Sequence, residues 1–174
     1  AALLALWPLG QFPVLRDDAS DLTVPETTTI LEYADRCLAS RPRLVPVDAE
    51  RAARARHQDR FYDLYVNTPM GKIVTDKIRP EGKHDPFGVE EARVTLGTAY
   101  DVANEQLKTM PWASGADFGL ADCAAAPALF YAGKVLPFAS SHPHLGAYFE
   151  RVSSRPSVAR TFAEAAPYLH MFPG

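Results

Sequence analysis

The feature that most constrains this chain is a run of apolar residues at 119–136, which leaves no polar face if the run is helical. A helix that is apolar on every side lies inside a domain, because other elements must cover its whole surface. Asp122, Pro127 and Lys134 interrupt the run, which argues against a membrane span. The sequence therefore predicts a central buried helix.

Other helices are predicted on both sides of this run. Apolar residues recur every three or four positions through 89–107 and through 145–152, which is the spacing of amphipathic helices. Pro156 suits the first turn of one more helix. Asp48 is placed to cap a long helix that ends near Thr68. The chain from Asp48 onward is thus predicted to be helical.

Two segments are predicted to lack regular structure. The stretch 69–86 contains three prolines and two glycines, so we expect a loop or a broken helix there. The stretch 41–47 has two prolines in seven residues. Such a composition favours a stiff, extended connector, which is a plausible boundary between domains.

The N-terminal part of the chain mixes strands with helices. Residues 2–6 resemble the end of a helix, and strands are expected at 13–16 and 22–24, separated by a turn rich in Asp and Ser. From Glu26 to about Ser40 the apolar positions fall at helical spacing, so a further helix is predicted there.

Two short pieces of this region together suit an amino-acid head group. Pro13 has no amide for a β-ladder, so we expect it at a strand start or edge, with Phe12 extended and its backbone groups available to a partner. Glu26 and Thr27 place a carboxylate and a hydroxyl beside the unpaired amides of a helix start. The carboxylate suits an ammonium group, and the hydroxyl and amides suit a carboxylate. Each piece also has a simpler interpretation, a strand edge in one case and helix capping in the other.

This arrangement resembles the glutathione transferase (GST) family, in which a strand enters through a cis-proline and an acidic residue with Ser or Thr opens the next helix. Residues 112–123 are also similar to the family's segment that enters its buried helix. There we expect Asp122 to reach back to the N-cap amide, and Phe118 to pack on Cys123. Gly119 replaces the family's usual hydroxyl residue, so the reciprocal side-chain bond is lost.

The resemblance covers the chain from about Leu3 to Phe172 and implies its organisation. The chain is expected to be mainly α: a partial thioredoxin-like α/β N-terminal domain at 1–40, a linker at 41–47, and an all-helical GST C-terminal domain at 48–174. It is identified as a bacterial-type cytosolic GST that lacks the first part of its thioredoxin-like domain.

The resemblance also implies a glutathione site. Phe12, beside Pro13, pairs through its backbone with the cysteinyl part of glutathione, and Glu26 and Thr27 hold the γ-glutamyl end. Gln11 occupies a position that is often a Lys contacting the glycyl carboxylate; glutamine can donate a hydrogen bond there but brings no charge. The residue that activates the thiol is expected upstream of this chain, so no catalytic residue is assigned.

Glutathione is thus the expected co-substrate, with a small hydrophobic electrophile as second substrate, in a detoxification reaction in the cytoplasm. The electrophile pocket is expected to include Tyr62, Asn67 and Met70, although aromatic residues at this spacing are also typical of a core. The long amphipathic helices favour a homodimer. Three alternatives stay open: a non-enzymatic binding or regulatory protein, a glutathione-dependent reductase, isomerase or dehalogenase, and a plain helical ligand-binding domain.

Composition argues against several other classes. The net charge of −3 offers no electrostatic footprint for nucleic acid or an anionic membrane. The Arg-rich run at 51–60 is interleaved with acidic residues, which is typical of a solvated helix face. Cys37 and Cys123 lie among apolar neighbours, so we expect buried thiols of a reducing compartment. The five histidines lack metal-ligand spacing, so no metal is expected.

Overall fold

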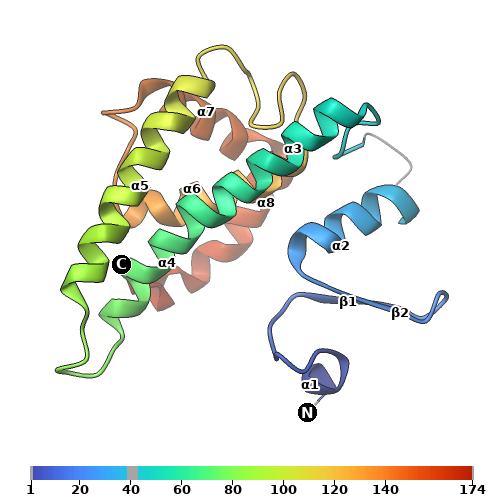
Figure 1. The fold of residues 1–174 in the computed structure, drawn as a ribbon, viewed down its shortest axis with the longest axis horizontal. Helices are drawn as coiled ribbons and strands as arrows, with labels where there is room; N and C mark the ends of the chain where they lie inside the picture. Colours follow the sequence, from blue (N-terminus) through green and yellow to red (C-terminus); the bar gives the residue numbers. More distant parts are fainter. Residues whose placement is uncertain (1, 39–42, 174) are drawn as a thin grey trace. The chain divides into compact units, whose positions relative to one another are not determined.

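The computed structural model describes residues 2–38 and 43–173. The chain forms two compact units, Ala1–Ala53 and Arg54–Gly174. As predicted, it is mainly helical: a small two-stranded sheet lies in the first unit, and the described part of the second unit is built from helices (Figure 1). The proposed boundaries at 40 and 48 stay a prediction, and the first two residues of the predicted linker lie outside the described residues.

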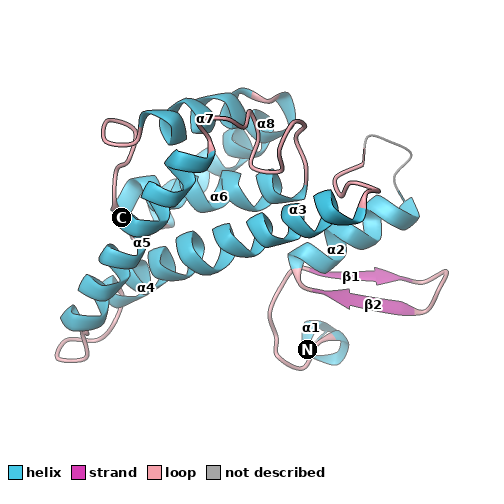
Figure 2. Ribbon diagram, turned by 45° about the horizontal axis from the view of Figure 1, so that its top comes forward, coloured by secondary structure: helices cyan, strands magenta, loops and turns pink. Residues whose placement is uncertain are grey.

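The first unit is built on an antiparallel hairpin. In chain order its elements are α1 (Ala2–Leu6), β1 (Val14–Asp17), β2 (Leu22–Pro25), α2 (Thr27–Tyr33) and the π-helical segment η1 (Ala34–Leu38). Figure 2 shows α2 beside the two strands, against which it packs. The Tyr33 hydroxyl donates a hydrogen bond to the Asp17 carboxylate, which ties α2 to β1.

A buried carboxylate lies in η1. Asp35 is 2% exposed, and it accepts backbone hydrogen bonds from Leu44 at 2.6 Å and from Val45 at 3.5 Å. These bonds give an acceptor to backbone amides that would otherwise lie in the protein without a hydrogen-bond partner. Because residues two apart on a helix do not share a face, Cys37 lies away from Asp35 and is exposed. The prediction of a buried Cys37 is therefore wrong, whereas Cys123 is half-buried.

The second unit packs its helices around α6. Its elements are α3 (Ala49–Phe61), which begins in the first unit, the π-helical η2 (Tyr62–Asn67), α4 (Thr68–Lys77), α5 (Pro86–Gln106), α6 (Leu120–Val135), α7 (Pro143–Ser154), α8 (Pro156–Ala165) and the 3₁₀ segment η3 (Ala166–Met171). Leu120 and Leu129 of α6 are wholly buried, so the predicted central helix is confirmed. Among the described helices, none combines the length and apolar character needed to cross a bilayer.

The helix capped by Asp48 runs further than predicted. Asp48 accepts the Arg51 amide at 2.9 Å, as expected of an N-cap residue. The helical path then continues without a break through η2 and α4 to Lys77. The prediction of a loop or broken helix over 69–86 is wrong for its first half, because only the turn at 78–85 is irregular.

The π-helical segment explains why a proline is tolerated inside this helix. In η2 the Thr68 amide bonds to the Asp63 carbonyl, five residues earlier, and the Thr68 hydroxyl donates to the same oxygen at 3.0 Å. A proline in an ordinary α-helix lacks a donor and clashes with the carbonyl four residues earlier. The wider turn directly before Pro69 changes that spacing, so the helix continues.

The N-terminus of α6 is closed by a buried carboxylate. Asp122 is 0% exposed, and its Oδ2 accepts the Gly119 amide at 2.9 Å, as predicted. Its oxygens also accept the amides of Ala113 (2.8 Å) and Ser114 (3.2 Å) and the hydroxyl of Tyr148 (2.8 Å). Burial, followed by the negative charge of Asp122, raises the pKa of Tyr148 well above its ordinary value. The capping carboxylate thus also joins α6 to α7.

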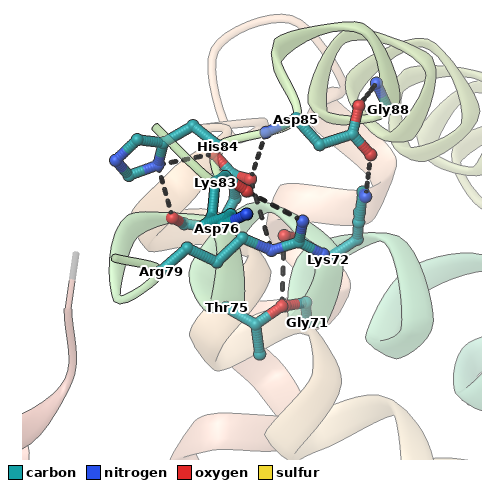
Figure 3. A network of polar contacts seen from close by, with 9 residues as sticks. All are labelled: Gly71, Lys72, Thr75, Asp76, Arg79, Lys83, His84, Asp85 and Gly88. Carbon is teal, nitrogen blue, oxygen red and sulfur yellow. Dashed lines mark hydrogen bonds and ion pairs between the residues drawn. The ribbon is translucent and has the colours of Figure 1, made fainter. Parts of the chain in front are cut away.

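A second polar network closes the turn between α4 and α5 (Figure 3). Asp76 accepts the Asp85 amide at 2.8 Å and lies 3.3 Å from Nδ1 of His84. Asp85 in turn accepts the Gly88 amide at 2.9 Å, which caps α5, and pairs with Lys72. The Asp85 amide holds the pKa of Asp76 below its ordinary value of 3.8, and the Lys72 ammonium does the same for Asp85.

Candidate functional site

The hairpin register brings the two predicted binding pieces together. Val14 of β1 pairs with Pro25 of β2, so the chain that enters β1 and the chain that leaves β2 lie at the same end of the hairpin (Figure 2). Pro13 and Glu26 are the next residues outward on the two sides. Opposite Cα atoms in an antiparallel pair are about 4.5–5.5 Å apart. Residues far apart in the sequence therefore share one small region of the first unit.

The segment that leads into β1, residues 11–13, is open to a partner. The Phe12–Pro13 peptide bond is cis, which is the isomer that the resemblance implied. Phe12 is 84% exposed, and Gln11 and Pro13 are exposed as well. Phe12 lies outside the β1–β2 ladder, and its backbone makes no hydrogen bond to any residue in the described ranges. An extended peptide is thus free to pair with it.

The segment between β2 and α2 carries the polar groups, which are the side chains of Glu26 and Thr27. Glu26 is the N-cap residue of α2, with φ 69° and ψ 127°, a conformation that residues other than glycine adopt rarely. Within the described part of the chain, neither the Glu26 carboxylate nor the Thr27 hydroxyl has a hydrogen-bond partner. The Thr29 hydroxyl donates to the Glu26 carbonyl at 2.8 Å and also to that of Pro25. This contact holds the peptide of Glu26 while leaving its side chain free.

These groups match the two charges of an amino-acid head and the peptide that follows it. The Glu26 carboxylate can accept from an ammonium, and the Thr27 hydroxyl can donate to a carboxylate. The first amides of α2 lack partners within the helix and add further donors. The backbone of Phe12 can pair with the adjoining peptide unit. Such charge-assisted bonds are stronger than neutral ones, so the region favours a zwitterionic peptide end.

The three residues predicted for the electrophile pocket do not share one environment. Tyr62 is 1% exposed and packs edge-on against the Phe61 ring, so its side chain belongs to the core of the second unit. Asn67 is exposed, at the end of η2. Met70 is buried on α4 and lines an apolar groove of about 470 Å³.

This groove lies wholly within the second unit, between α4, Tyr131 of α6 and the C-terminal residues 165–173. Sequence reasoning missed it, apart from Met70. The apolar C-terminal residues, among them Phe172, were a signal that an apolar partner exists. Their partner on α4 lies about a hundred residues earlier, beyond the reach of any local pattern.

No metal site is found in the described ranges, and the thiol of Cys123 is held in its protonated form. No group of three or more His, Cys, Asp or Glu side chains there is placed to hold a metal ion. Burial raises the pKa of the Cys123 thiol to about 11, so this sulfur is protonated at neutral pH.

Comparison with protein families and curated proteins finds related sequences. Residues 68–156 match the family model described as the glutathione S-transferase C-terminal domain. Glutathione S-transferase GstB of Escherichia coli strain K12 is 25% identical over 160 residues, which cover 92% of this chain and 77% of the relative. Glutathione S-transferase GstA of Escherichia coli O157:H7 is 28% identical over 155 residues, covering 88% and 73%.

Solved structures show the same fold. A glutathione S-transferase from Methylobacillus flagellatus, crystallised with glutathione bound, matches with a TM-score of 0.83 at 23% identity, covering 91% of this chain and 79% of that one. Glutathione S-transferase III in its apo form matches with a TM-score of 0.78 at 28% identity, covering 92% and 76%. At 23% identity, the similarity to the Methylobacillus flagellatus structure shows the fold alone.

Proposed function

This chain belongs to the glutathione S-transferase family, and we propose that it binds glutathione and transfers the glutathione thiolate to a small hydrophobic electrophile. The supporting observation is the register of the hairpin, which puts Pro13 and Glu26 side by side. In this proposal the backbone of Phe12 pairs with the cysteinyl peptide. Glu26 takes the γ-glutamyl ammonium, and Thr27 with the first amides of α2 takes the α-carboxylate. Gln11 contacts the glycyl carboxylate.

The proposed chemistry is activation of a thiol followed by nucleophilic attack. A free thiol has a pKa of about 8.5, so hydrogen-bond donors near the sulfur increase the thiolate fraction at neutral pH. Holding the thiolate against an electrophile supplies much of the remaining acceleration. The sulfur attacks an electrophilic carbon and the leaving group departs with the electron pair. No residue of this chain is assigned as the donor to the sulfur, and neither Cys37 nor Cys123 is proposed for that part.

Binding of glutathione to the full-length protein tests the proposal. Glu26→Gln removes the negative charge at nearly constant shape and should weaken binding by about 2 kcal/mol, roughly thirtyfold, measured by calorimetry. Asp18→Asn is the matched control, because it removes the same charge at the exposed far end of the hairpin. Equal affinity of Glu26→Gln and the wild type would refute the site.

Turnover separates an enzyme from a binding module. The full-length protein should conjugate a generic aryl halide to glutathione, and the Glu26→Gln variant should lose rate in step with its loss of binding. Glutathione binding without any turnover of aryl halides would favour a regulatory protein. Reduction of disulfides or release of halide would favour the related glutathione-dependent enzymes.

We also propose that the protein acts in the cytoplasm as a homodimer, in a detoxification role. Phe87 and Val94, which are 73% and 62% exposed on α5, support an apolar contact between two copies. Sedimentation should show a dimer, and Val94→Glu should shift it toward the monomer because a charge is costly in an apolar contact. An unchanged dimer in that variant would place the contact elsewhere.

A further inference from the structure

Glu26 holds a backbone conformation that few residues other than glycine adopt. Its φ is 69° and its ψ is 127°. Of the described residues other than glycine, only Asp21 shares a positive φ, and Asp21 lies in the hairpin turn, where aspartate tolerates such angles. A strained conformation persists only where the surrounding structure enforces it. A neighbouring group must therefore hold Glu26 in place.

The Thr29 hydroxyl, in the first turn of α2, is that group. It donates to the Glu26 carbonyl at 2.8 Å and shares its proton with the Pro25 carbonyl. The Pro25 carbonyl belongs to the peptide plane before the Cα atom of Glu26, and the Glu26 carbonyl belongs to the plane after it. The angles φ and ψ of Glu26 are the rotations that relate these two planes. One hydroxyl bonded to both carbonyls therefore restrains both angles.

A similar pair of bonds in α4 shows what is particular to Thr29. Helical threonines often bond to carbonyls three and four residues earlier. The Thr75 hydroxyl does so, donating to Gly71 at 2.8 Å and to Lys72 at 3.3 Å, but both of these carbonyls lie inside the helix, where the backbone ladder already holds them. The Pro25 carbonyl belongs instead to the last residue of β2. The bond from Thr29 thus reaches across the strained residue.

The two sides of Glu26 are held to different degrees. The Ile30 amide bonds to the Glu26 carbonyl at 2.9 Å, so α2 holds the peptide plane after Glu26 without help from Thr29. Thr29 adds a hold on the plane before it. These angles set the direction of the Cα–Cβ bond, and the exposed carboxylate has no partner among the described residues that would direct it otherwise. The backbone therefore decides where the carboxylate points.

We propose that Thr29 is a positioning residue, whose hydroxyl keeps Glu26 in the conformation that directs its carboxylate to the ammonium group of the ligand. This inference rests on the proposed function, which assigns the γ-glutamyl ammonium of glutathione to Glu26. Without the hydroxyl, Glu26 relaxes for part of the time into an ordinary conformation. The apparent affinity for a ligand with an ammonium group then falls with the fraction of molecules that keep the competent conformation.

Calorimetry with two ligands on the full-length protein tests this inference. The ligands are glutathione and glutaryl-cysteinylglycine, which differs from glutathione only in lacking the amino group. Thr29→Val removes the hydroxyl at nearly constant shape and should weaken glutathione binding about fivefold. It should bind the deaminated ligand within about twofold of the wild type, because that ligand has no ammonium for Glu26. Thr29→Ser keeps the hydroxyl and should bind glutathione like the wild type.

Two further variants isolate the effect. Thr161→Val is the matched control, because the exposed Thr161 makes the same kind of bond, to the Ser157 carbonyl at 3.0 Å, within α8 of the second unit. It should bind both ligands like the wild type. Adding Thr29→Val to Glu26→Gln should cause little further loss of glutathione affinity, since the carboxylate that Thr29 positions is already gone.

The outcomes separate this inference from the proposed function. Wild-type affinity for glutathione in Thr29→Val would overturn the inference and leave the proposed function standing. Equal losses for the two ligands would also overturn it, because Thr29 would then only stabilise the first unit. Absence of glutathione binding by the wild type would overturn the proposed function and this inference with it. If Thr29→Val fails to fold, Thr29→Ala takes its place with the same expected results, since alanine is the better helix former.

Discussion

The Tyr148 hydroxyl donates a 2.8 Å hydrogen bond to the Asp122 carboxylate in the core of the helical unit, where both residues are 0% exposed. The same carboxylate accepts three backbone amides. A buried carboxylate with four donors is satisfied, but its removal would leave all four without an acceptor. This one side chain therefore closes α6, anchors the preceding loop and holds α7.

Substitution of Asp122 should be far more costly than substitution of its hydroxyl partner. We expect Asp122→Ala to lower the free energy of unfolding by about 3–5 kcal/mol, because several buried donors lose their acceptor. Tyr148→Phe removes one donor and should cost only about 1–2 kcal/mol. Urea unfolding measures both. Asp117→Ala, at an exposed carboxylate in the same loop, should stay within about 0.5 kcal/mol of the wild type. A cost for Asp122→Ala no larger than this control would contradict the role given to Asp122.

The turn between α4 and α5 should become less stable in acid. The pKa values of Asp76 and Asp85 lie below 3.8 in the folded chain, so the unfolded chain binds their protons first as the pH falls. Their stabilisation is complete above pH 3.8 and is lost as the pH drops through the folded values. We expect Asp76→Asn to be less stable than the wild type at about pH 7, with the gap closing toward about pH 3.

Urea unfolding of the wild type and Asp76→Asn between about pH 7 and about pH 3 measures the difference between their free energies of unfolding. Glu81→Gln is the control, because Glu81 is exposed in the same turn. Its free energy of unfolding should stay within about 0.5 kcal/mol of the wild type at about pH 7. A gap for Asp76→Asn that stayed constant down to about pH 3 would mean that the carboxylate charge contributes nothing.

Helical glycines should respond to alanine according to the space around them. At Gly71 and Gly97 an added Cβ would have no neighbour within 4 Å, so Gly71→Ala and Gly97→Ala should each stabilise by about 0.5–1 kcal/mol. At Gly146 a Cβ would lie 3.2 Å from the Ala139 carbonyl oxygen, so Gly146→Ala should lower the thermal midpoint. Equal midpoints for Gly146→Ala and Gly97→Ala would show that α7 adjusts freely.

A cation at position 11 should improve glutathione binding. Gln11 is exposed and brings no charge to the proposed glycyl carboxylate contact. Gln11→Lys should raise the affinity by about two- to fivefold, as expected of an exposed ion pair, and the gain should shrink with added salt. Calorimetry at low and high salt measures it, with Gln11→Met as the uncharged comparison. No gain at low salt would place the glycyl end of the tripeptide away from Gln11.

Local sequence patterns predicted most of the helices, because helix formation depends on residues that are close together in the sequence. The spacing through 89–107 indicated α5, and Leu96 and Ala103 are wholly buried there, as that spacing requires. The cap at Asp48 and the bond from Gly119 to Asp122 were also predictable, since each joins residues three positions apart.

The errors arose where a distant or unusual contact overrides local preference. Pro69 predicts a break by its own chemistry, but the π-helical turn before it lets the helix continue. Cys37 lies in an apolar pattern, yet the buried Asp35 sets which side of that helix faces inward. The spacing of apolar residues predicts neither the wider turn before Pro69 nor the hydrogen-bond partners of Asp35.

The sequence by itself determined most elements of this protein: all the longer helices except α4, the approximate positions of the two strands, and the residues that begin several helices. The tertiary structure alone decided which of these elements meet. It paired Val14 with Pro25, so that Pro13 and Glu26 became neighbours, and it brought Met70 and Phe172 to one groove. The physical reason is range: periodicity and capping act over three to five residues, whereas such meetings depend on how all the apolar surfaces of a unit pack together.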